Sequence, residues 1–376
     1  MNKKRSLAFL VFLALLLAGC SKNNSTNSTS TPTTNPTPST GGAVGTTGVC
    51  SVSISSPSAC TSSTGLSKII CLCDQFKTSL SSSQVATLQL PYTFANVKTW
   101  SNLPAALSPR LGLRLGDLTS AQVGLAKAII KEITGSSLNS GYDEVQQLWL
   151  ADDYLNGNGG GATYGSGNYY IAIFGTPATT GQFEILFTGH HKTVANTYKD
   201  GVLIGATPRF IAIEPLSFTN ASINYTPVNQ EKTAFVNLLS ALNPSQLSTA
   251  KSSLTFSDLL LTPGKDWQFP TTFTGLQCNS LTSAQKALVL AAIQTYTNDV
   301  TDTDGSAILA KYNSDIDNTY ITYSGTGTFN TQNDYIRIDG PNVWIEFSVQ
   351  RAIVLTGVHY HSVWRDRNTD YGTTKP

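Results

Sequence analysis

The stretch Leu118-Thr119-Ser120-Ala121-Gln122 occurs a second time, unchanged, as Leu281-Thr282-Ser283-Ala284-Gln285. Each copy has the form of a capping box, in which a hydroxyl caps the start of a helix and a Gln three positions later reaches back. Two looser copies of the pattern run over 80–84 and 242–246, at nearly the same offset from each other. Repetition at a constant spacing predicts an internal duplication of the chain.

Other matches respect a similar offset. Trp100 precedes Pro104 as Trp267 precedes Pro270, and residues 168–177 (NYYIAIFGTP) resemble 333–341 (NDYIRIDGP). The sheet-like runs FEILF and IEFSV place Glu184 opposite Glu346. We therefore expect a single duplicated domain over 75–376, with halves at about 75–230 and 231–376 that share one core.

Each half begins with helices and ends with strands. Apolar residues at spacings of three and four predict helices near 119–134, 142–156, 229–241 and 282–299. Alternating segments between Gly, Pro and Asn turns predict strands at 168–174, 182–188, 192–198, 319–324, 334–339, 343–349 and 352–363. Helices followed by an antiparallel β-meander, twice, give an α+β fold with pseudo-twofold symmetry.

The start of the chain is typical of an exported lipoprotein. Basic residues at 3–5 precede an apolar run over 7–17, and Leu17-Ala18-Gly19-Cys20 follows as a lipobox. This pattern predicts a signal peptide over 1–19, lipid attachment at Cys20 and a membrane anchor. Ser21 follows the cysteine, so a Gram-negative host would send the protein to its outer membrane, and a Gram-positive host would keep it on the outer face of its membrane.

Two further segments precede the duplicated domain. Residues 20–47 are mostly Ser, Thr, Asn, Pro and Gly, a composition that predicts a disordered linker. Residues 48–74 form a Cys-rich segment, in which two local disulfides are the favoured expectation for an oxidising compartment. A metal or redox role for Cys71 and Cys73 is the alternative.

Charge excludes some partners. Without residues 1–19 the chain has 21 basic and 23 acidic residues, and no basic stripe remains. Nucleic acid is therefore excluded as an expected partner. The abundance of Tyr, Asn, Ser and Thr suits a small molecule, a glycan or a peptide, and does not choose among them.

The four histidines form two short clusters, His190-His191 and His359-Tyr360-His361. On a strand, His359, His361 and Arg365 share one face and Asp366 takes the other. Two imidazoles on one face can bind one metal ion, and His190-His191 can join them only at a turn, which Gly189 permits. Tyr169, Tyr170, Glu184, Glu214, Glu346 and Asp366 are candidates to complete or support such a site.

The alternative for these clusters is structural. Histidines near strand ends often bond to backbone carbonyls or buried acids, and Arg365-Asp366 can form a salt-bridged corner. The glycine-rich stretch 157–167 lacks the Lys of a phosphate loop, so we interpret it as a loop, with a lid over a site as its candidate role.

Several of these motifs carry a resemblance to a known family. Residues 100–104 (WSNLP), 169–177 (YYIAIFGTP), 189–191 (GHH), 207–210 (TPRF), 336–347 (IRIDGPNVWIEF) and the terminal HYHSVWRD with DYG resemble the uncharacterised family named domain of unknown function 3500. The resemblance covers about residue 90 to the C-terminus. Phe183 and Glu184 depart from its pattern. It implies no activity.

Two functions remain. In the first, the protein is an extracytoplasmic hydrolase in which His359, His361, Arg365 and Asp366 carry out catalysis and His190, His191, His359 and His361 are candidate ligands of a divalent metal such as Zn. In the second, it is a non-catalytic surface lipoprotein that binds a ligand or partner. The sequence does not decide whether the protein is an enzyme, and it names no organic cofactor.

Overall fold

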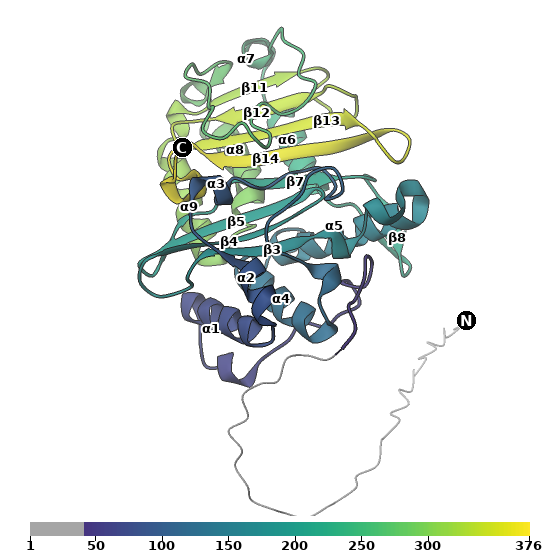
Figure 1. Cartoon of the computed structure of the whole chain (residues 1–376). Helices are drawn as coiled ribbons and strands as arrows, with labels where there is room; N and C mark the ends of the chain where they lie inside the picture. The colour runs from purple at the N-terminus through teal and green to yellow at the C-terminus, as the bar shows by residue number, and fades with distance from the viewer. Residues whose placement is uncertain (1–40) are drawn as a thin grey trace, which may run out of the picture. The chain divides into compact units, whose positions relative to one another are not determined.

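The computed structural model describes residues 41–376, which form helices packed on one large sheet (Figure 1). The helices are α1 Gly65–Thr78, α2 Ser82–Leu88, α3 Phe94–Val97, α4 Ser120–Glu132, α5 Gly141–Leu155, α6 Asn229–Ser240, α7 Pro244–Ala250, α8 Ser283–Thr297 and α9 Asp302–Ser314. In this part of the chain, no helix combines the length and the apolar character that a membrane span requires. The predicted signal peptide, Cys20 and most of the predicted linker lie outside the described residues.

All four predicted capping boxes are present. Ser81, Thr119, Asn243 and Thr282 each accept from the amide of the Gln three residues later, and that Gln side chain accepts from the capping residue's own amide. The four predicted helices are confirmed as α4, α5, α6 and α8. Helix α9 was not predicted, because its sequence is polar and its apolar face is short.

The strands follow in two runs, separated by α6 to α9. The first run is β1 Gln89–Leu90, β2 Leu113–Arg114, β3 Tyr170–Gly175, β4 Gln182–Gly189, β5 Lys192–Lys199, β6 Val202–Gly205, β7 Arg209–Ile213, β8 Phe218–Asn220 and β9 Ile223–Tyr225. The second is β10 Leu276–Gln277, β11 Tyr320–Ser324, β12 Tyr335–Asp339, β13 Val343–Arg351 and β14 Val358–Asp366. The predicted α+β class is confirmed.

One sheet contains twelve of these strands. Its order is β1-β3-β4-β5-β7-β14-β13-β12-β11-β10, with β2 also on β3 and β6 also on β5. Its pairs are antiparallel except β1 with β3. The two runs meet where β7 pairs with β14, and His361 stands opposite Ala212 at that junction.

Side-chain alternation divides the core. Ile171 and Ile173 of β3 pack with α1, α4 and α5, whereas Ala172 and Phe174 point to the opposite face. That opposite face is covered by α3 and by irregular segments, and α6 and α8 lie behind the sheet in Figure 1. The buried residues form three clusters, two on the helical face and one on the other, and not the single shared core that we expected.

The last predicted strand, 352–363, is partly wrong. Residues 352–357 form the tip of the β13–β14 hairpin, and β14 begins at Val358. Glu214 accepts hydrogen bonds from the amides of Ile353, Val354 and Leu355, which removes those amides from strand pairing. Strand β7 was missed, because its five residues gain their partners only from distant strands.

The N-terminal segments also differ from the prediction. Residues 41–47, expected to belong to the linker, contact the domain: the amides of Val44 and Gly45 donate to the carbonyls of Leu118 and Gly116. The linker prediction extended too far because it rested on amino-acid composition, which cannot show which backbone amides form hydrogen bonds. Residues 48–74 share a core with α4 and do not stand apart.

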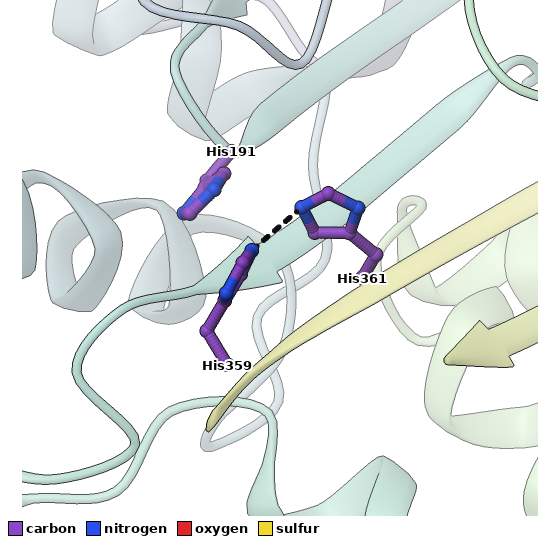
Figure 2. A group of neighbouring side chains, drawn as sticks. All are labelled: His191, His359 and His361. Carbon is purple, nitrogen blue, oxygen red and sulfur yellow. Dashed lines mark hydrogen bonds between the residues drawn. The ribbon is translucent and has the colours of Figure 1, made fainter. Parts of the chain in front are cut away.

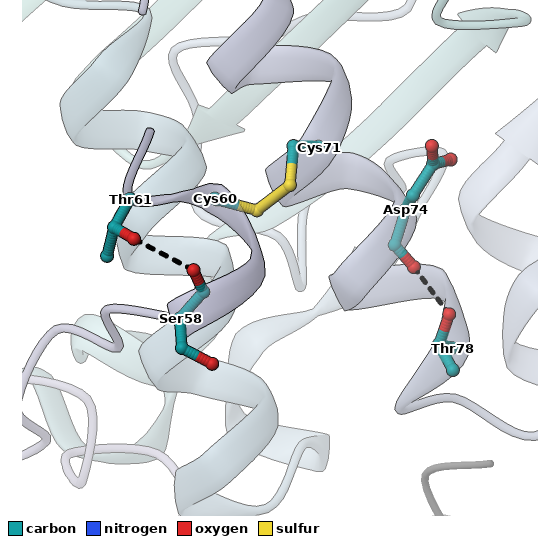
Figure 3. The surroundings of a disulfide bond; sticks show 6 residues. All are labelled: Ser58, Cys60, Thr61, Cys71, Asp74 and Thr78. Atoms are coloured by element: carbon teal, nitrogen blue, oxygen red, sulfur yellow. Dashed lines mark hydrogen bonds between the residues drawn. A yellow bond between two sulfur atoms is a disulfide. The ribbon is translucent and has the colours of Figure 1, made fainter. Parts of the chain in front are cut away.

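One disulfide replaces the two that we expected. It joins Cys60 to Cys71, the latter in α1, as Figure 3 shows. Cys50, Cys73 and Cys278 are free thiols. Cys71 and Cys73 are two residues apart on a helix and therefore face different directions, and Cys71 is bonded to Cys60, so the alternative metal or redox pair does not form.

Candidate metal centre

The two histidine clusters meet in the middle of the strand order, where β4 ends and where β5 and β14 begin. His190 and His191 form the turn between β4 and β5, and His359 and His361 lie on β14. The ring centroid of His191 is 5.6 Å from those of both His359 and His361. Side-chain nitrogens of these three residues lie within 4.8 Å of one another, as Figure 2 illustrates.

Strand pairing explains this convergence. His359 and His361 alternate with Tyr360, so they point to the same face of the sheet as Val363. The β4–β5 turn lies beside β7, because Lys192 pairs with Ile211 and the Ala212 amide donates to the His191 carbonyl over 2.9 Å. Since β14 pairs with the other edge of β7, both clusters reach one point.

The turn itself is tightly held. His191 has a φ of 65°, a left-handed conformation that His adopts more often than most residues. The carbonyl of Gly189 accepts from Arg110 over 3.2 Å, and that of His190 accepts from the Tyr169 hydroxyl over 2.6 Å. The His191 amide donates to the carbonyl of Asn102 over 3.3 Å. Separate elements therefore fix where His191 places its ring.

His361 is oriented by a carboxylate. Its Nδ1 lies 3.0 Å from Oδ1 of Asp258, so this nitrogen carries the proton and Nε2 presents a lone pair. That Nε2 is 3.0 Å from Nε2 of His359. Burial would raise the pKa of the Asp258 carboxyl, but the hydrogen bond from His361 and the charge of that ring hold this pKa below its usual value.

Two rings of the centre, those of His191 and His359, are uncharged at neutral pH. Burial, and then the neighbouring imidazoles, lower the pKa of His191 well below its usual value and that of His359 to about 3. Within residues 41–376, the buried Nδ1 atom of His359 has no hydrogen-bond partner. Three imidazoles with converging nitrogens form a donor set that suits Zn, Cu, Fe or Ni.

His190 has a different place from the one we predicted. Its ring stacks on that of His191 with centroids 3.5 Å apart, and its Nδ1 lies 2.7 Å from Oδ1 of Asp152. It is not part of the group whose nitrogens converge. Tyr164 of the glycine-rich loop packs edge-on against it at 4.9 Å, so that loop does lie over this part of the site.

The predicted placement of Arg365 and Asp366 at the site is wrong. Arg365 is fully buried and bonds to Asp370 at 2.7 Å and to Asp266 at 3.0 Å, so no substrate anion can reach it. Asp366 points to the helical face, where it accepts from the hydroxyl of Tyr312 over 2.9 Å. Both residues form ion pairs, as the structural alternative expected, but not with each other: the partner of Asp366 is Lys311.

The other candidate residues do not join the three-histidine group. Glu346 accepts from the amides of Leu260 and Leu261, and Glu214 holds the β13–β14 tip. Glu184 is buried and accepts from Thr197. Tyr169 bonds to the turn, and Tyr170 only begins β3.

The sequence interpretation missed Asp258 and Asp152. Asp258 is the one charged residue of the segment 252–264, and this isolation could have marked it as a candidate site residue. Asp152 lies four residues after Leu148 and three before Leu155, on the buried face of α5, a spacing that indicates a buried acid.

Comparison with known proteins identifies the family of this chain but indicates no function. No curated protein and no solved structure matches this chain. A family model described as "Protein of unknown function (DUF3500)" matches residues 62–373, so the match begins earlier than the resemblance indicated. All four histidines and Asp258 lie within the matched residues. The chain therefore belongs to the DUF3500 family.

Proposed function

We propose that this protein is an exported metalloprotein whose metal centre consists of His191, His359 and His361. The observation that carries the proposal is the convergence of three buried side-chain nitrogens within 4.8 Å. The pairing of His361 with Asp258 supports it, because metal-binding histidines commonly donate their other N–H to a carboxylate. Zinc is the first candidate ion, since three imidazoles leave its fourth position open.

Metal content of the purified protein tests this proposal. We expect one ion per chain, and its loss in His191→Ala and His359→Ala. His190→Gln is the matched control, because His190 lies beside the centre without joining it. A folded chain that takes up none of zinc, copper, iron or nickel at micromolar concentration would refute the metal centre.

Hydrolysis is the reaction class that we propose for this centre. A bound zinc ion lowers the pKa of its water and so supplies a nucleophile at neutral pH. Burial lowers the pKa of His191 and so keeps this ligand uncharged, Asp258 orients His361, and Tyr164 packs against the neighbouring His190. Metal-dependent cleavage of ester or amide substrates, abolished by His361→Ala, is the expected result. A metal-loaded protein with no such activity would favour the non-catalytic ligand-binding alternative.

We also propose that the protein is lipid-anchored through Cys20, on the strength of the signal and lipobox pattern. Labelling of cells with a radioactive fatty acid should mark the wild-type protein and leave Cys20→Ser unmarked. Equal labelling of both would contradict the assignment.

We infer, finally, that the halves arose by duplication. The sheet order is mirrored about the β7–β14 junction. Leu113 pairs with Ile171 at one end as Leu276 pairs with Ile321 at the other. The amides of Leu115 and Cys278 then each donate over 2.8 Å to a carbonyl that precedes the paired strand.

A further inference from the structure

Three segments surround the histidines and form what we name the apolar rim: 101–108, 252–264 and 352–357. The first reaches the centre through the Asn102 carbonyl, which accepts from His191. The second reaches it through Asp258, which bonds to His361. The third leads directly into β14 and is held by Glu214, which follows the last residue of β7.

The rim exposes large apolar side chains. Eight large hydrophobic residues are exposed in the described part of the chain, and five of them belong to the rim. They are Leu103, Leu107, Leu254, Leu260 and Ile353, with Leu107 69% and Ile353 75% exposed. Such a concentration of exposed apolar side chains in three short segments indicates a surface that meets an apolar ligand.

Charge is almost absent from the same segments. Asp258 is the one charged residue of the three, and its carboxylate bonds to His361. The rim therefore offers no ionic contact to a phosphate, a polyanion or a charged peptide. Its other polar side chains are uncharged hydroxyl and amide groups.

We propose that the ligand of this site is an amphiphile with one polar head and a medium-length acyl chain. The head binds at the three-histidine centre, and the chain lies along the rim. The complementarity is between one metal-binding point beside a nearly uncharged, largely apolar rim and a molecule with one polar head and an apolar chain. This assignment rests on the proposed metal centre for its head group, whereas the rim carries the chain by itself.

Alkyl hydroxamates of increasing length test the proposal, because the hydroxamate binds zinc and only the chain varies. The probe protein is the full chain with Cys20→Ser, loaded with zinc and titrated by calorimetry. Affinity should rise from acetohydroxamate to decanohydroxamate, by up to about fourfold for each fully buried methylene. Leu107→Ser and Ile353→Ser should lower the affinity for decanohydroxamate at least ~10-fold. They should leave zinc content and acetohydroxamate binding unchanged, as should the control Ile223→Ser, an exposed residue outside the rim.

Affinity that does not depend on chain length, or on the rim variants, would overturn the amphiphile. So would rim-dependent sedimentation with phosphatidylcholine vesicles without chain-length dependence, which would indicate a bilayer surface. Rim-dependent self-association would overturn it in favour of a second copy of the chain. If the protein takes up none of zinc, copper, iron or nickel, the metal centre fails. Decanoate titrated into the metal-free protein then tests the apolar site separately. Rim-sensitive binding then supports the apolar site, and no binding overturns it.

Discussion

At the residue scale, Asp258 is the most informative position, because its carboxylate orients a metal-candidate ring from 3.0 Å away. Asp258→Asn keeps the size of the side chain and removes its charge. We expect metal affinity to fall about 10- to 100-fold, as is usual when such a partner is lost. Competition with a chelator measures the change. Asp117→Asn, on the surface, is the control, and an equal loss there would argue against a specific role.

Glu184 predicts a pH dependence of stability. Burial raises the pKa of this carboxyl to about 8, although the Thr197 hydroxyl lowers it in part. In the unfolded chain the group titrates near 4.3. Between these values the folded state binds the extra proton, so this group makes stability fall as pH rises from about 4 to 8.

Glu184→Gln mimics the protonated side chain and should remove that dependence. The variant should be more stable than wild type at pH 8, by on the order of a few kcal/mol, and nearly equal to it at pH 5. Urea unfolding at the two pH values measures the difference. An unchanged gap between pH 5 and pH 8 would show that Glu184 is not the responsible group.

At the scale of elements, the capping boxes were fully predictable because a cap is local. Thr282→Ala should destabilise the protein by about 1 kcal/mol, since the amide of Gln285 loses its acceptor. Thermal unfolding measures the change. Ser283→Ala, one residue later and outside the cap, should have little effect. Equal effects of the two variants would contradict the capping role.

The β4–β5 turn is the element that places His191 in the proposed metal centre. Tyr169→Phe removes the hydroxyl that donates to the His190 carbonyl and leaves the fold's packing surface intact. Because the turn positions His191, we expect weaker metal binding, by about 10-fold, with a smaller loss of stability of roughly 1 kcal/mol. Phe187→Leu, on a ring stacked against Tyr169, is the packing control. Reduced stability with unaltered metal affinity would make Tyr169 purely structural.

What the sequence could not supply at this scale is long-range pairing. Helices α4, α5, α6 and α8 follow from local periodicity. Strand β7 was missed because its five residues owe their conformation to β5 and β14. The site depends on β7, so the sequence could name the histidines and leave open which of them converge. The role of Arg365 was misinterpreted for the same reason: its partner Asp266 is 99 residues away in the sequence, so the ion pair that buries Arg365 could not be foreseen.

At the scale of the molecule, the internal repeat does not explain where the histidine centre lies. By position in the sheet, β3 corresponds to β11, although the sequence match linked it to β12. Under either correspondence the two histidine clusters do not occupy equivalent places. His191 comes from the first half and His359 and His361 from the second, so the centre exists only when the halves are joined.

A buried ionic cluster joins them. Lys192, which follows His191, bonds to Asp299 over 3.0 Å and also to Glu144, and all three are buried. Arg209 donates to the Asp299 carbonyl. Glu144 and Lys192 belong to the first half and Asp299 to the second, so this cluster spans the junction directly beneath the turn.

Lys192→Met should therefore destabilise the whole molecule. Removing one member of a buried ion pair leaves uncompensated charge and costs about 3–5 kcal/mol. Lys286→Met, which breaks a surface pair with Asp317, should cost ~1 kcal/mol or less. Denaturant unfolding compares the two, and metal uptake should fall in the first variant alone, because the turn loses its anchor. Similar stabilities for both variants would mean that the halves are held by apolar packing and that the cluster contributes little.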